Sequence, residues 1–224
     1  MKVSLLQPEI IRGNINYNSK KVQELVNQSS GDLLVLPEYV FTGSLVLDEQ
    51  ADLDQWCKDV KHAKEKINIP TGKILLINSL VTQDGKKYNC YQLLPTTKKQ
   101  IKVHPDQTER IKGIVPGQNH GVFTFYDKKF KILICPDFKY WKLIETAGLD
   151  FVIWVYHFTA ENYQKRITEL RNFVRERKTP VLVSSLVSDQ NSGMSLYIED
   201  DKIVALSKHE GILEVEFDQQ KHRQ

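Results

Sequence analysis

The chain has 224 residues, of which 41% are hydrophobic and 26% are charged, so it is long enough to bury a substantial core. Its 31 basic residues are interleaved with 28 acidic ones and leave a formal net charge of only +3, which argues against a nucleic-acid-binding tract. No linker-like or repetitive segment divides the sequence. We therefore expect a single α/β domain over residues 1–224.

The sequence also argues against a membrane protein and against a metal site. The apolar run at its start is too short for a secretory signal, and no apolar stretch of transmembrane length follows. The three cysteines form no C-x-x-C pair, and the six histidines show no ligand spacing. We expect a cytoplasmic protein without membrane or nucleic-acid partners, disulfide framework, metal or cofactor.

Strands and helices alternate along most of the chain. Short apolar or β-branched runs between turn residues predict strands at 2–6, 33–36, 74–81, 88–94, 130–134, 151–156 and 181–187. Apolar residues at helical spacing predict helices at 18–26, 53–67, 140–146 and 163–174. Strands at 195–199, 203–207 and 212–217 suggest an antiparallel meander. Because several strands are apolar on both faces, we expect a four-layer αββα sandwich of two stacked mixed sheets flanked by helices.

Three polar residues stand out beside the predicted strands. Glu38 and Cys135 each follow an apolar strand next to a proline, and Lys102 lies in a short extended segment between Ile101 and Val103. Each has an ordinary interpretation when taken alone: a solvated rim glutamate, a small buried thiol, and the polar face of an edge strand. The three residues indicate a function only when they are considered together.

Together they resemble the Glu-Lys-Cys triad of the nitrilase, or carbon-nitrogen hydrolase, superfamily. The family's three triad motifs are matched by LPEYVFTG at residues 36–43, KVH at 102–104 and ILICPDFK at 132–139. The triad positions are 64 and 33 residues apart, as in a compact member of the family. Later segments are similar as well: GLDF at 148–151, LRNFV at 170–174 and GMS at 193–195.

The resemblance implies hydrolysis of a non-peptide carbon-nitrogen bond in a small linear amide. Cys135 would attack the amide carbonyl and form a thioester, with Glu38 as the base and Lys102 as the stabiliser of the oxyanion. Ammonia or an amine would be released. Glu109 is the nearest match to a second, substrate-positioning glutamate, and His157 is a candidate substrate contact at a strand end. The resemblance also implies a homo-oligomer, with a dimer as the expected form.

Several residues depart from the family pattern. Pro136 has no backbone N–H to donate to an oxyanion, although the residue after the cysteine commonly does so in the family. Lys139 replaces the usual arginine, and Trp141 and Lys142 replace the usual Pro-Glu. A catalytically silent relative that binds a small amide or a protein partner therefore stays open as the alternative. Nitrile hydrolysis is a third possibility, although nitrile-converting members typically carry tryptophan where this chain has Pro136.

Overall fold

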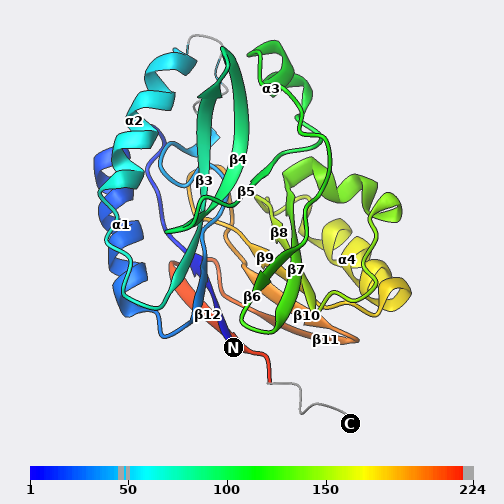
Figure 1. The fold of residues 1–224 in the computed structure, drawn as a ribbon. Helices are drawn as coiled ribbons and strands as arrows, with labels where there is room; N and C mark the ends of the chain where they lie inside the picture. The colour runs from blue at the N-terminus through cyan, green and yellow to red at the C-terminus, as the bar shows by residue number, and fades with distance from the viewer. Residues whose placement is uncertain (45–47, 49–50, 219–224) are drawn as a thin grey trace.

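The structure, a computed structural model, describes residues 1–44, 48 and 51–218. Twelve strands form two six-stranded sheets that lie against one another between layers of helices (Figure 1). The first sheet has the order β12-β1-β2-β3-β4-β5, and the second has the order β11-β10-β9-β8-β7-β6. This is the four-layer αββα sandwich expected from the sequence.

The first sheet contains β1 (Lys2–Gln7), β2 (Leu33–Val35), β3 (Ile74–Gln83), β4 (Lys86–Leu94), β5 (Lys99–Ile101) and β12 (Gly211–Glu216). The second contains β6 (Phe123–Phe125), β7 (Lys128–Ile134), β8 (Phe151–Val155), β9 (Val181–Ser184), β10 (Leu196–Glu199) and β11 (Lys202–Ala205). Each sheet has three parallel strands at its centre, β1-β2-β3 and β7-β8-β9, with antiparallel strands on both sides. Both sheets are therefore mixed, as predicted.

Helices cover the outer faces of the two sheets (Figure 1). Helices α1 (Ile15–Gln28) and α2 (Leu53–Glu65) bury their apolar stripes on the first sheet, and α4 (Tyr163–Arg177) does so on the second. The short α3 (Gln107–Ile111) and the 3-10 helix η2 (Cys135–Leu143) follow β5 and β7. In the described part of the chain, no helix is both long and apolar enough to cross a membrane.

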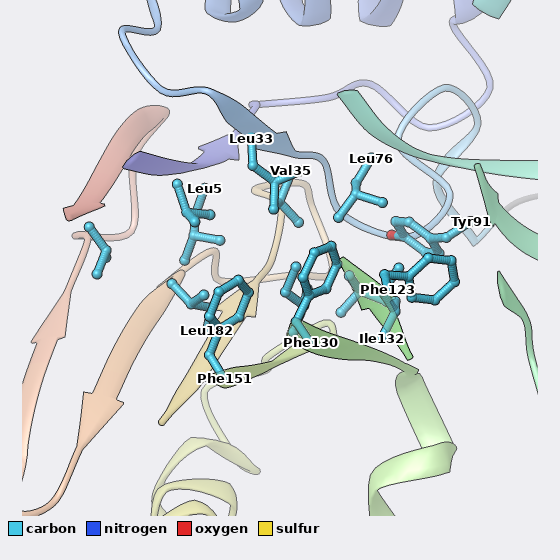
Figure 2. Close-up of a cluster of buried hydrophobic side chains, with 14 of the residues drawn as sticks. Leu5, Leu33, Val35, Leu76, Tyr91, Phe123, Phe130, Ile132, Phe151 and Leu182 are labelled. Carbon is cyan, nitrogen blue, oxygen red and sulfur yellow. The ribbon is translucent and has the colours of Figure 1, made fainter. Parts of the chain in front are cut away.

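The inner faces of the two sheets share one hydrophobic core. Figure 2 shows Leu5, Val35 and Leu76 of the first sheet pointing toward Phe130 and Ile132 of the second. All of these side chains have no exposed surface, and Phe130 also stacks on Phe151 with ring centroids 5.1 Å apart. Burial on this scale explains why the central strands read as nearly continuous apolar runs.

The predicted C-terminal meander is only half right. Strands β10 and β11 do pair as an antiparallel hairpin, but β12 crosses to the other sheet and pairs antiparallel with β1. Leu213 and Val215 of β12 thereby pack in the core between the two sheets. Periodicity along the sequence identifies a strand, but it does not identify the strand's partner.

The buried Gln7 holds this crossing in place. Its Nε2 donates to the carbonyls of Ser207 (2.8 Å) and His209 (2.6 Å), and its Oε1 accepts from the backbone N–H of Ser195 (2.6 Å). One side chain of β1 therefore satisfies three backbone groups in the segments that surround β10 and β11. Gly193 passes directly beside it.

Two glycines allow the cost of this close approach to be measured. Gly193 and Gly72 both have positive φ, +66° and +85°. A Cβ at Gly193 would lie 2.7 Å from Gln7 Nε2, whereas one at Gly72 would meet nothing within 4 Å. We expect Gly72→Ala to lower the free energy of unfolding by about 1–2 kcal/mol, the cost of the left-handed backbone. Gly193→Ala should lower the free energy of unfolding by about 1–3 kcal/mol more, because its Cβ would also clash with Gln7.

Urea denaturation of the two variants measures both losses. Equal losses for Gly193→Ala and Gly72→Ala would show that the crossing tolerates a methyl group.

Candidate active site

A buried lysine forms the centre of the site. Lys102 directly follows β5, and its backbone N–H donates to the carbonyl of Asn89 on β4 (2.9 Å). Its side chain is only 1% exposed, and its Nζ lies 2.9 Å from Glu38 Oε1 and 2.7 Å from Glu109 Oε2. Burial lowers the pKa of Lys102, but Glu38, Cys135 and Glu109 together raise it above its ordinary value. The ammonium is therefore fully charged at neutral pH.

Glu38 emerges from the end of β2 in a strained turn. The next residue, Tyr39, has a φ of 51°, a left-handed conformation that is uncommon for an aromatic residue. The Tyr39 backbone N–H donates to Asn78 Oδ1 (3.0 Å), and its hydroxyl donates to Glu109 Oε1 (2.6 Å). These bonds hold the turn so that the carboxylate of Glu38 faces Lys102.

Asn89 links the two carboxylates, and it was not predicted from the sequence. Its Nδ2 lies 2.7 Å from Glu38 Oε1, 2.8 Å from Glu109 Oε1 and 3.0 Å from the Tyr39 hydroxyl. Its Oδ1 accepts from Asn78 Nδ2 (2.6 Å). A signal was present in the sequence, because Asn78 and Asn89 each lie beside an apolar residue within a predicted strand, and a buried amide requires partners.

Glu109 lies beside Lys102, as the sequence predicted. It is the third residue of α3 and forms a capping box with Asp106: Glu109 Oε2 accepts from the Asp106 N–H (2.8 Å), and Asp106 Oδ1 accepts from the Glu109 N–H (2.9 Å). Burial raises the pKa of Glu109, but the adjacent Lys102 and the hydrogen bonds from Tyr39 and Asn89 together lower it below its ordinary value. Glu109 is therefore a permanent counter-charge to the ammonium.

Cys135 stands where β7 ends and η2 begins. Its φ is 49°, an unusual conformation for a residue that precedes a proline, so the backbone at the thiol is strained. The Cys135 carbonyl accepts a hydrogen bond from Trp154 Nε1 on β8 (2.9 Å). Asp137 steadies the same turn, because its carboxylate accepts from the N–H groups of Ile134 (3.1 Å) and His104 (2.7 Å).

The Cys135 thiol and the Glu38 carboxylate influence each other electrostatically. Burial and the nearby charge of Glu38 raise the pKa of Cys135 well above its ordinary value, although Lys102 opposes them. Burial also raises the pKa of Glu38, and the charge of Lys102 offsets part of this effect. At neutral pH the Cys135 thiol is therefore protonated in the resting site, and Glu38 is more basic than an ordinary carboxylate.

A small cavity of about 180 Å³ opens at the thiol. Its walls come from η2, from β8 and the residue that follows it, from α4, and from the residue before α3. The residues that line it are Asp106, Cys135, Pro136, Phe138, Lys139, Trp154, Tyr156 and Arg166. Glu38 and Lys102 are not among them. Larger hollows of about 660 and 760 Å³ lie beside α2 and contain no predicted site residue. The cavity at Cys135 has room only for a small molecule.

His157 contacts the backbone of Glu38. It follows β8, and its Nε2 is 2.8 Å from the backbone carbonyl of Glu38. Burial lowers the pKa of His157 to about 4, so the ring is neutral at pH 7 and donates its Nε2–H to that carbonyl. The predicted contact with substrate stays a prediction. The contact in the structure is with the Glu38 turn.

No family model matches the chain, and no curated protein matches it in sequence. Among solved structures, the glutamine-dependent NAD+ synthetase of Acinetobacter baumannii is similar with a TM-score of 0.81 and 22% identity. The similarity covers 97% of this chain, and the chain spans 45% of the length of that protein.

Smaller proteins match over nearly their whole length. The NitN amidase of Nesterenkonia sp. AN1 has a TM-score of 0.80 and 15% identity, with 100% of this chain and 96% of that chain covered. XC1258 of Xanthomonas campestris, a CN-hydrolase superfamily protein with an arsenic adduct in its active site, has a TM-score of 0.75 and 14% identity, with 96% and 89% covered. At these identities, the likeness shows a shared fold.

The neutral His157 predicts a specific pH dependence of stability. Its pKa is about 4 in the folded protein and about 6.5 in an unfolded chain, so between these values only the unfolded state binds the proton. Stability should therefore be intact above pH 6.5 and fall as the pH drops toward 4, with a slope of up to about 1.4 kcal/mol per pH unit. His157→Asn retains an N–H donor and should flatten this dependence.

Urea denaturation at pH values between about 4 and 8 measures the slope. His62→Asn on the exposed surface of α2 is the control and should leave the slope unchanged. The assignment is wrong if His157→Asn follows the parent protein throughout this range.

Proposed function

We propose that this chain, which has the fold of the nitrilase superfamily, is an enzyme that hydrolyses the carbon-nitrogen bond of a small linear amide. The observation that carries the proposal is the arrangement around Lys102: an ammonium buried between Glu38 and Glu109, and close enough to Cys135 to oppose the rise in its pKa. A nucleophile in the wall of a small cavity, together with a base and a buried cation that act on its thiol electrostatically, suits acyl transfer through a thioester.

In the first half of the proposed reaction, Glu38 takes the proton from the Cys135 thiol as sulfur attacks the amide carbonyl. The C–S bond forms, and the carbonyl oxygen becomes an oxyanion beside the Lys102 ammonium. Glu38 then gives its proton to the amide nitrogen, and ammonia or an amine leaves as the C–N bond breaks. The raised pKa of Glu38 suits both steps, because one carboxyl group must accept and return a proton near neutral pH.

In the second half, Glu38 deprotonates a water molecule that attacks the thioester. The C–S bond breaks, the carboxylic acid leaves, and the proton returns to the sulfur of Cys135. Glu109 keeps Lys102 in position throughout, because its carboxylate remains ionised while Glu38 gains and loses its proton. The role of Glu109 in substrate binding that the sequence suggested would then act through Lys102.

Some of the solved structures give this chemistry a precedent. In one variant of the Nesterenkonia amidase, glutamine replaces a glutamate. Acrylamide has added to the active-site cysteine of that variant. In a second variant, with leucine in place of that glutamate, the acetamide moiety of fluoroacetamide is attached to the cysteine. Those findings belong to that protein. They support the proposal that Cys135, which lines the cavity here, meets small amides in the same way.

The alternative is a catalytically silent protein that binds a small amide or a protein partner. Pro136 favours it, because the residue after the nucleophile has no N–H to offer an oxyanion. The loss of one such donor lowers the rate on the order of 100- to 1000-fold without abolishing catalysis, so we favour the enzyme. We also propose a cytoplasmic homodimer, as expected from the sequence.

Amide hydrolysis should require both the Cys135 thiol and the Lys102 ammonium. We expect Cys135→Ala and Lys102→Ala to remove nearly all ammonia release from formamide, acetamide, propionamide, carbamoyl compounds and ω-amides. Cys57→Ala and Cys90→Ala are matched controls, because both thiols are buried and burial raises the pKa of Cys90 to about 11. These controls should keep most of their activity. A Cys135→Ala protein that still released ammonia would disprove the mechanism.

Pro136 allows the missing donor to be tested directly. If the turn keeps its shape, Pro136→Ala restores a backbone N–H and should raise kcat by up to about 100-fold. The measurement is kcat on the best amide from the screen, with circular dichroism to confirm folding. A folded Pro136→Ala protein without any gain would show that the second oxyanion donor comes from elsewhere in the chain.

A further inference from the structure

One of the larger hollows has no part in the proposed reaction. Figure 1 shows α2 beside β3 and β4 of the first sheet, and residues from these three elements line a hollow of about 760 Å³. None of these residues also lines the cavity at Cys135. A space of this size accommodates a small organic molecule.

The wall of this hollow carries more positive than negative charge. Both of its acidic side chains are already paired with lysines: Asp54 with Lys87 at 3.1 Å, and Glu65 with Lys61 at 3.9 Å. Two other lysines of the wall, Lys58 and Lys64, form no ion pair with any residue that the structure describes. The hollow therefore holds two positive charges for which the described part of the chain provides no counter-ion.

Lys64 is half-buried, whereas the other lysines of the wall are exposed. Its Nζ donates to Ser79 Oγ on β3 (3.2 Å) and to Gln92 Oε1 on β4, and both acceptors are neutral. Burial lowers the pKa of Lys64, and the neighbouring Cys90 and Glu65 offset this effect only in part. An ammonium has three N–H groups, so one is left for a ligand. An anion bound there would supply the counter-charge that Lys64 lacks.

Gln92 adds a second donor to the same wall. An ammonium can bond only to the oxygen of a side-chain amide, so the contact with Lys64 fixes which end of Gln92 is the Nε2 group. Within the described residues, this Nε2 makes no hydrogen bond. The wall is partly apolar as well, because Leu80 and Val81 line it. The hollow therefore combines two cations, an amide donor and an apolar surface.

We propose that this hollow binds a small phosphorylated molecule, with the phosphate group at Lys64, Gln92 and Lys58 and the carbon chain on Leu80 and Val81. A phosphate monoester carries close to two negative charges at neutral pH, which matches the two unpaired lysines. Lysine binds phosphate as a compact point charge, whereas a planar carboxylate is best matched by arginine, and none of the described residues in this wall is an arginine. The site is independent of the proposed hydrolysis.

Isothermal titration calorimetry with matched probes tests the ligand class. Butyl phosphate and pentanoate carry the same butyl chain and differ in a phosphate against a carboxylate, and inorganic phosphate lacks the chain. We expect butyl phosphate to bind at least about tenfold more tightly than pentanoate, as for an additional charge-assisted hydrogen bond, and more tightly than inorganic phosphate. No binding of butyl phosphate by the parent protein, or equal affinity for pentanoate, overturns the inference.

Variants separate recognition from a structural role of these residues. Lys64→Met removes the charge but keeps most of the length of the side chain, and it should weaken binding of butyl phosphate at least about tenfold. Gln92→Glu gives Lys64 the counter-ion that it lacks, so it should abolish binding and leave the Tm unchanged or higher. The control is Lys20→Gln, an exposed residue of α1 whose loss changes the net charge by the same amount as Lys64→Met. It should bind as the parent protein does.

Cys57 reports where the ligand binds, because it lines this hollow and is 8% exposed. The measurement is the rate of its alkylation by iodoacetamide, followed by peptide mass spectrometry, with and without butyl phosphate. We expect the ligand to slow alkylation of Cys57 at least about tenfold at saturation and to leave that of Cys135 unchanged. Protection of Cys135 in place of Cys57 would put the ligand in the other cavity and overturn the inference. Unchanged binding in folded Lys64→Met and Gln92→Glu proteins, or equal weakening by Lys20→Gln, would do the same.

Discussion

The arrangement of the site depends on one buried cation. An ammonium group that is 1% exposed is stable only if anionic or strongly polar groups surround it, since an unpaired charge in the interior is very costly. Glu38 and Glu109 provide the two charges, and Asn89 contacts both carboxylates. These residues come from three separate segments, so the lysine determines how the loops at this edge of the sheets must meet.

The same electrostatics separate the roles of the two glutamates. Both are buried beside one lysine, yet the pKa of Glu38 is raised and that of Glu109 is lowered. Glu109 accepts hydrogen bonds from Tyr39, from Asn89 and from the backbone at Asp106, all of which favour its ionised form. Glu38 has fewer such donors. The surroundings therefore leave one carboxylate able to exchange a proton and keep the other charged.

The sequence predicted the layers and most strands, because apolar runs are local signals. The approach of Glu38 and Glu109 to Lys102 was expected only from the resemblance to the nitrilase superfamily. The sequence could not show that β12 pairs with β1, since pairing depends on partners about two hundred residues away. Asn89 and Arg166 were not predicted either. An amide within a strand and an arginine on a helix are ordinary residues until the fold brings one to a carboxylate and the other to a cavity. Residues 140–146 were predicted as a helix, whereas the 3-10 helix begins earlier, at Cys135.

The crossing of β12 has a consequence for how the chain is made. Strand β1 is synthesised well before β12, so its open edge is covered only when Gly211–Glu216 arrives, and the Met1 amino group then contacts the Phe217 carbonyl at 3.0 Å. Until that moment, an apolar strand edge remains available to other chains. All the residues proposed for catalysis are synthesised before it. Completion of the first sheet therefore waits for the synthesis of β12, and the long separation between β1 and β12 makes this a slow, late step of folding.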